Sequence, residues 1–164
     1  MAEMTSTEKR GALSIAPEDP RTDELRALLG ELDAELFARY PEAVAGGVKL
    51  AAPDLFVPPD GAFVVAREQA RPLGCGALLR LSGNLVEVKR MFVRAEARGQ
   101  GVARRVLAAL EDLGRAWGAS TIRLETGCRQ PEAIALYRSC GYRDIPRYPP
   151  YEDDPLSVCF AKAL

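Results

Sequence analysis

A glycine-bearing loop carries the residues of this sequence best suited to bind a ligand. It reads Arg98-Gly99-Gln100-Gly101-Val102-Ala103, after an apolar segment at 85–93 and before apolar residues at helical spacing from Val106 to Trp117. We predict a strand, a tight loop and a helix in that order. The first N–H groups of a helix have no partner within it, and the helix dipole makes that end positive. The loop is therefore expected to bind an anion such as a pyrophosphate, which the two glycines allow the backbone to approach closely.

Two common phosphate-binding patterns do not match this loop. A P-loop ends in Lys followed by Ser or Thr, whereas Ala103-Arg104-Arg105 stands here. The dinucleotide fingerprint Gly-x-Gly-x-x-Gly would place its third glycine at Arg104. The pattern that does match is Arg-x-x-Gly-x-Ala, formed by Arg98, Gly101 and Ala103. A glycine-rich turn that only joins strand to helix is the alternative interpretation.

The loop must be positioned by a sheet, and the hydrophobic pattern predicts one. The three strands between 61 and 93 are joined by short turns, which predicts an antiparallel meander. A helix then crosses over to a strand at 120–125, which should lie parallel to 85–93. Gly74-Cys75-Gly76 predicts a bulge or a close backbone approach, and 41–60 is expected to be loop with one helical turn at 46–52. Strands are predicted at 11–16, 61–66, 73–81, 85–93, 120–125, 142–145 and 156–162, and helices from Asp19 or Thr22 to Tyr40, at 101–117 and at 131–140.

Size and composition limit the function classes. The 164 residues are expected to form one domain, 1–164, with ordinary apolar (48%) and charged (27%) fractions. A net charge of −1 gives no electrostatic case for nucleic acid or an anionic membrane. No apolar run approaches the roughly 20 residues of a membrane helix, and 1–10, expected to be disordered, has no signal-peptide core. We therefore expect a cytoplasmic protein.

The side chains available for proton transfer are limited as well. The chain has no histidine, which excludes Ser-His, Cys-His and His-metal chemistry by this chain. Its four cysteines, Cys75, Cys128, Cys140 and Cys159, form no C-x-x-C pair. We expect reduced, mostly buried thiols and no metal site. Carboxylates, Tyr, Cys, Lys or water must therefore move any proton.

A second motif lies at 124–142. It reads Leu124-Glu125-Thr126-Gly127, then Gln130-Pro131-Glu132-Ala133-Ile134-x-Leu136-Tyr137-x-x-x-Gly141-Tyr142. Together with the loop, it resembles the acetyl-CoA-binding and catalytic core of the GNAT superfamily of N-acetyltransferases, over 85–142. The resemblance implies an α/β (α+β) fold, the GNAT-like acyl-CoA acyltransferase fold, with a mixed sheet of six or seven strands and helices on both faces. It also implies an enzyme that transfers acetyl from acetyl-CoA to a primary amine by direct attack in a ternary complex, without a metal.

The resemblance further implies which residues hold acetyl-CoA. Backbone N–H groups near Met91-Phe92, on a splayed strand, would bond the thioester and the pantetheine arm, and the loop amides would hold the pyrophosphate. The Arg104 side chain is expected to contact phosphate and Arg98 to stabilise the loop. Many members carry Asn near the position of Gln130, which is longer. The cofactor-binding candidates are Met91, Phe92, Val93, Arg98, Gly99, Gln100, Gly101, Val102, Ala103, Arg104 and Gln130.

Tyr137 is the proton donor that the resemblance implies. A phenol is protonated at neutral pH and can give its proton to a departing thiolate; a core tyrosine on the apolar helix face is the alternative. Glu87, a carboxylate among apolar neighbours, is the candidate base, acting through water. The alternatives are an ion pair of Glu87 with Lys89 or Arg90, Glu125 as the base, or water alone.

The sequence leaves the acceptor open. Small molecules and free amino acids are the first choice, and a protein N-terminus or lysine is the second. An acidic run at 152–154, with Tyr148 and Tyr151, either attracts a cationic amine or is a solvated turn. A non-catalytic acyl-CoA sensor is the rival from another class, and an NTP-binding switch is disfavoured because the Lys-Ser/Thr pair is missing. The oligomeric state, a homodimer included, is open too.

Overall fold

One mixed sheet forms the centre of the fold. The computed structural model describes residues 11–164, so the disorder expected at 1–10 lies outside the described residues. The strand order is β1-β2-β3-β4-β5-β7-β6. The strands are β1 (Leu13–Pro17), β2 (Gly61–Glu68), β3 (Arg71–Arg80), β4 (Leu85–Val93), β5 (Thr121–Gly127), β6 (Arg143–Ile145) and β7 (Ser157–Ala163). The helices are α1 (Asp23–Arg39), α2 (Pro41–Ala45), α3 (Val102–Ala116) and α4 (Pro131–Ser139), with 3-10 turns at Pro53–Leu55 and Ala95–Ala97.

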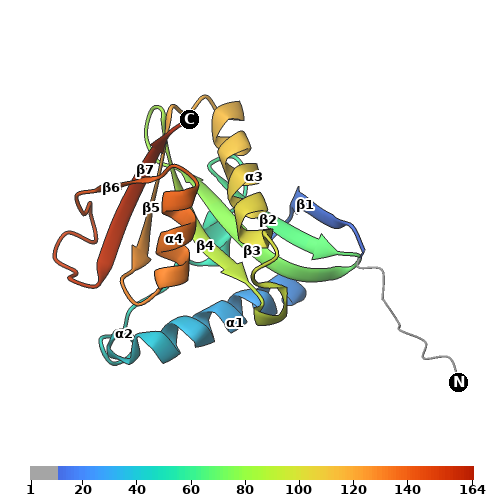
Figure 1. Ribbon diagram of the computed structural model, residues 1–164, viewed down its shortest axis with the longest axis horizontal. Coiled ribbons are helices and arrows are strands. Elements are labelled where there is room, and N and C mark those ends of the chain that lie inside the picture. The colour runs from blue at the N-terminus through green and yellow to red at the C-terminus, as the bar shows by residue number, and fades with distance from the viewer. Residues whose placement is uncertain (1–10) are drawn as a thin grey trace, which may run out of the picture.

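Helices lie on both faces of the sheet (Figure 1). Val106 of α3 and Tyr137 of α4 pack on the face that carries Val88. Leu28 of α1 packs on the opposite face, which carries Val65. A strand buries alternate residues on its two faces, so neighbouring residues of β2 and β4 enter different cores. This seven-stranded sheet between helices confirms the predicted fold class.

β4 and β5 run parallel, which confirms the predicted crossover through α3. Their pairing comprises four residue pairs, from Leu85–Thr121 to Val88–Leu124. Beyond these pairs, β4 continues to Val93 beside β3 and β5 continues to Gly127 beside β7. The facing backbone edges of residues 89–93 and 125–127 are therefore not paired with each other. We call these two segments the β4–β5 fork.

The segment 41–60 differs from its predicted form. The helical turn expected at 46–52 is wrong, because the turn is α2 at Pro41–Ala45. Proline suits the first position of a helix, where its missing N–H would have had no partner. Gly47, with φ of +69°, follows the end of α2. Gly30 lies within α1 and does not interrupt it.

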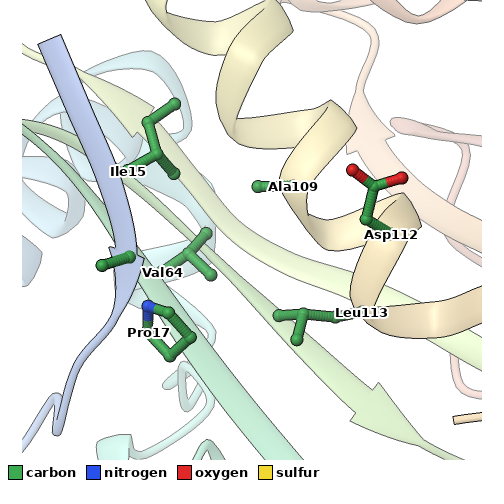
Figure 2. A pocket seen from close by; sticks show the side chains of 7 residues that line it. Ile15, Pro17, Val64, Ala109, Asp112 and Leu113 are labelled. Carbon is green, nitrogen blue, oxygen red and sulfur yellow. The ribbon is translucent and has the colours of Figure 1, made fainter. Parts of the chain in front are cut away.

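A shallow apolar hollow of about 280 Å³ lies at the β1 edge of the sheet. Figure 2 shows Ile15 and Val64 of the sheet across from Ala109 and Leu113 of α3. Its one charged lining residue is Asp112. None of the lining residues is a catalytic or cofactor-binding candidate, so the chemistry must be sought at the fork.

Leu110 of α3 tests the core on which the glycine loop depends. Its side chain is 0% exposed, and Leu110→Ala is expected to lower the free energy of unfolding by about 2–5 kcal/mol, because it leaves a cavity. Urea denaturation measures this loss. Leu81→Ala, where the side chain is 39% exposed, is the control and should cost less than about 1 kcal/mol. Equal losses for the two variants would contradict the described packing of α3.

Candidate active site

A bulge in β4 marks the start of the candidate site. Two residues of β4, Arg90 and Met91, oppose the single residue Gly76 of β3, which confirms the bulge predicted around Gly74-Cys75-Gly76. A Cβ at Gly76 would come within 2.7 Å of the Met91 sulfur, so this approach requires glycine. Arg90 has φ of +58°, which is rare for a residue of its size. The extra residue inverts the alternation of β4, since Met91 packs on the same core as Val88.

The fork brings three predicted cofactor-binding residues to one place. Met91, Phe92 and Val93 lie on the arm of β4 that β5 no longer pairs. Across from them, β5 continues through Glu125 to Gly127. Backbone groups along the two arms can pair with an extended ligand, in the way that a peptide adds a strand to an open edge.

The loop after β4 offers six consecutive backbone N–H groups. Within residues 11–164, no acceptor is bonded to the N–H of any residue from Gly99 to Arg104. The first helical bond of α3 runs from the N–H of Arg105 to the carbonyl of Gly101, at 3.1 Å. Gly101 has φ of +79°, and a Cβ there would meet nothing within 4 Å. The loop therefore has unpaired donors and open space at the positive end of a helix, as an anion site requires.

The two arginines of the loop have different roles in the structure. Arg98 donates to the carbonyl of Val93 at 2.8 Å and pairs with Glu35 of α1 at 2.5 Å. These contacts join the loop to the end of β4 and to α1, and the loop-stabilising role of Arg98 stays a prediction. Arg104 instead donates to the hydroxyl of Ser139, at the end of α4, at 2.7 Å. A phosphate contact by the Arg104 side chain would require this hydrogen bond to be exchanged, whereas its backbone N–H is available.

The carboxyl end of β5 is held from two sides. The side-chain oxygen of Gln130 accepts the N–H of Gly127 at 3.2 Å. The hydroxyl of Tyr40, directly after α1, accepts the N–H of Arg129 at 2.9 Å. Figure 1 shows the α1–α2 junction next to this end of β5. Tyr40 is a site residue that the sequence did not predict, because Tyr40-Pro41 signals only the end of a helix.

Tyr137 faces the sheet from α4 with 5% of its surface exposed. Its ring centroid lies 5.9 Å from that of Tyr142 and 6.0 Å from that of Phe160. Burial raises the pKa of the Tyr137 hydroxyl, and the charge of Glu125 raises it further. The phenol therefore stays protonated across the neutral range, as a proton donor must.

Glu87, the predicted base, is buried and paired twice. It pairs with Lys89 at 2.6 Å and with Arg123, its register neighbour on β5, at 3.4 Å. The structure therefore contains the ion pair with Lys89 that was the alternative interpretation, whereas Arg90 pairs with Asp33. Both ion pairs would have to break before the carboxylate of Glu87 could accept a proton from an incoming amine.

Glu125 lies beyond the last β4–β5 pair and has fewer restraints. The hydroxyl of Ser157 donates to it at 2.7 Å. Burial raises the pKa of Glu125, while the bond from Ser157 and the charge of Lys89 oppose this shift. Leu124 packs with the α3 and α4 core, so the alternation of β5 places Glu125 on the opposite face.

Two tyrosines of the loop between β6 and β7 pack on the cations of this face. Arg123 lies 3.7 Å from the ring centroid of Tyr148, and Lys89 donates to the hydroxyl of Tyr151 at 2.7 Å. Burial raises the pKa of both hydroxyls. In the acidic run, Asp154 accepts the N–H of Leu156 at 2.9 Å, so it stabilises the turn.

All four cysteines are free; Cys75 and Cys159 are buried, Cys140 is half-buried and Cys128 is exposed. Residues 11–164 contain no group of three or more His, Cys, Asp or Glu side chains arranged to hold a metal ion. None of the helices in this part of the chain has the length and apolar character needed to span a bilayer.

Known proteins resemble the chain along most of its length. The model of the acetyltransferase (GNAT) family matches residues 21–142. An IAA acetyltransferase from Azospirillum brasilense is 42% identical over 153 residues, 93% of this chain and 98% of the relative. A Klebsiella pneumoniae structure described as a candidate acyl-CoA N-acyltransferase has a TM-score of 0.75 at 33% identity, covering 93% of this chain and 97% of that chain. A Bacillus subtilis acetyltransferase in complex with CoA has a TM-score of 0.66 at 19% identity, covering 93% and 99%. The chain belongs to the GNAT family of acetyltransferases.

Proposed function

We propose that this protein transfers acetyl from acetyl-CoA to the primary amine of a small molecule or amino acid. The observation that carries the proposal is the run of unpaired N–H groups from Gly99 to Arg104, directly after a forked strand pair. The CoA complex of the Bacillus subtilis neighbour supports the donor. The name of the Azospirillum brasilense relative, IAA acetyltransferase, supports a small-molecule acceptor.

The described residues fit acetyl-CoA. Six N–H donors at the positive end of α3 suit a diphosphate, and the open edges of the fork suit an arm that contains amides. When bound, acetyl-CoA supplies an acetyl group activated as a thioester. Backbone N–H groups of Met91 and Phe92, next to the bulge, are the proposed donors to the thioester carbonyl oxygen. Gln130, which holds the end of β5, is the proposed contact for the arm.

Tyr137 and Glu125 divide the proton transfers in this proposal. Glu125 accepts the proton of the amine, directly or through water, on the α1 face of the sheet. Tyr137 gives its proton to the leaving thiolate on the α4 face. The two groups flank the fork from opposite faces, so the acceptor and the leaving group do not compete for space. Glu87 then keeps Lys89 and Arg123 in place.

The donor site is tested by the paired variants Gly101→Ala and Gly118→Ala. Both glycines have positive φ, +79° and +80°, at opposite ends of α3, and neither has an atom within 4 Å of an added Cβ. Both variants therefore carry similar backbone strain. Gly101→Ala is expected to weaken acetyl-CoA binding by about tenfold or more, because its Cβ crowds the anion site. Gly118→Ala should bind as the wild type does, as measured by titration calorimetry.

Acetyl transfer itself is measured by free-thiol release from acetyl-CoA with a panel of amines and peptides. Release above background with a small amine supports the proposal. Binding of acetyl-CoA without release for any acceptor would instead favour a non-catalytic sensor. Thermal stabilisation by ATP but not by acetyl-CoA would contradict the proposed donor.

A further inference from the structure

We propose that the acceptor carries a carboxylate close to its amine, as a free amino acid does, and that Arg90 binds this carboxylate. The inference rests on the proposed function and names the class of its acceptor. The candidate site is a hollow of about 230 Å³ between α1, the segment 50–53 and β4, which we call the Arg90 hollow. The lining residues that matter here are Arg26, Leu29, Asp33, Leu50, Pro53 and Arg90.

The guanidinium of Arg90 is buried and has spare donors. Its side chain is 7% exposed and pairs with Asp33 at 2.5 Å. The Nε atom of Arg90 has no hydrogen-bond partner in the described part of the chain. A guanidinium carries five N–H donors, and buried donors are normally satisfied. An additional acceptor at this position would satisfy them.

The charges around the hollow favour an anion. Two arginines, Arg26 and Arg90, and one carboxylate, Asp33, line it. The excess is one positive charge, which matches one carboxylate. A carboxylate also fits the planar donor fork of arginine with two parallel hydrogen bonds. The apolar lining from Leu29, Leu50 and Pro53 suits a small aliphatic or aromatic body next to that group.

The unusual backbone conformation at Arg90 favours a functional role for its side chain. Arg90 is the extra residue of the bulge, at φ of +58°. Glycine and asparagine adopt this conformation more easily than arginine does. A bulge changes the face of the sheet to which a side chain points. Here the Arg90 side chain lies on the face covered by α1, and the Met91 side chain lies on the face covered by α3.

The position of Arg90 connects the hollow to the reaction. Arg90 belongs to the β4 arm of the fork, directly before Met91 and Phe92, the proposed thioester contacts. One small molecule can therefore reach both the guanidinium of Arg90 and the thioester. The first residue of a peptide has no free α-carboxylate, because that carboxyl group forms the peptide bond to the second residue. The Arg90 hollow therefore selects free amino acids over protein and peptide amines.

The test compares acceptors that differ in the carboxylate alone. Thiol release from acetyl-CoA is measured for α-amino acids, their α-amides and the matching decarboxylated amines, with the wild type, Arg90→Gln and Arg94→Gln. Arg94 also pairs with α1, through Glu31 at 2.6 Å, but it does not line the hollow, so it controls for the loss of a β4–α1 ion pair. Calorimetric binding of the same compounds in the presence of CoA is the second measurement.

We expect the wild type to prefer the acid over its amide by about 10- to 100-fold in kcat/KM. Arg90→Gln should abolish this preference, and Arg94→Gln should keep it. Transfer to amines with equal rates for acid and amide would overturn the inference and leave the proposed function intact. If Arg90→Gln does not fold, the wild-type ratio alone decides. If no amine is acetylated, carboxylate binding by the wild type still supports the hollow, and its absence overturns it.

Discussion

Tyr137→Phe is expected to lower kcat by about 100- to 10,000-fold and to leave acetyl-CoA affinity close to that of the wild type. The change removes the hydroxyl and keeps the ring, which packs against Tyr142 and Phe160. The helix should therefore stay in place while the leaving thiolate loses its proton donor. Steady-state kinetics and calorimetric titration with acetyl-CoA measure the two effects separately.

Tyr142→Phe is the matched control for this variant. Tyr142 belongs to the same aromatic cluster, and its hydroxyl is buried and without a partner in the described part of the chain. Removing it should change kcat by less than about threefold, since it lies outside the proposed proton path. Equal losses for both variants would mean that the cluster serves packing, and full activity of Tyr137→Phe would remove the proposed acid.

Glu125→Gln is expected to reduce kcat/KM by about 100-fold or more and to abolish the acid limb of its pH profile. A base works only when it is ionised, and burial raises the pKa of Glu125. Wild-type activity should therefore fall as the pH falls through this raised pKa, at a higher pH than an exposed glutamate would give. Glutamine keeps the size of the side chain and cannot accept the proton. Reaction rates measured between about pH 5 and 9 show whether the acid limb disappears in Glu125→Gln.

Glu87→Gln separates the two glutamates. Glu87 is buried between Lys89 and Arg123, so its neutralisation leaves two cations without their shared partner. We expect Glu87→Gln to cost about 3–5 kcal/mol of stability, whereas Glu125→Gln costs little stability and much activity. An intact acid limb in Glu125→Gln, with its loss in a folded Glu87→Gln, would return the role of base to Glu87.

The strand, loop and helix around Gly101 could be predicted because several local signals agree there. β-Branched residues precede the glycines, and apolar residues at helical spacing follow them. The bulge could be predicted only in part. The glycines of β3 indicate a close approach, but no residue type on β4 marks Arg90 as the extra residue.

The α1 side of the site could not be predicted from local patterns. Its contacts join residues far apart in the chain, such as Arg98 with Glu35 and Tyr40 with the backbone of Arg129. Many charged residues could form such pairs in a sequence, and topology alone selects among them. The same reason explains Glu87, since its pairing with Arg123 follows from the parallel register of β4 and β5, which no spacing in the sequence reveals.

The sheet consists of two blocks, β1-β2-β3-β4 and β5-β7-β6. They share one short seam of four residue pairs between β4 and β5. A ligand arm lying in the fork would add hydrogen bonds to both blocks and lengthen this seam. Donor binding would then strengthen the pairing of the two halves of the sheet, which already share the buried core under α3.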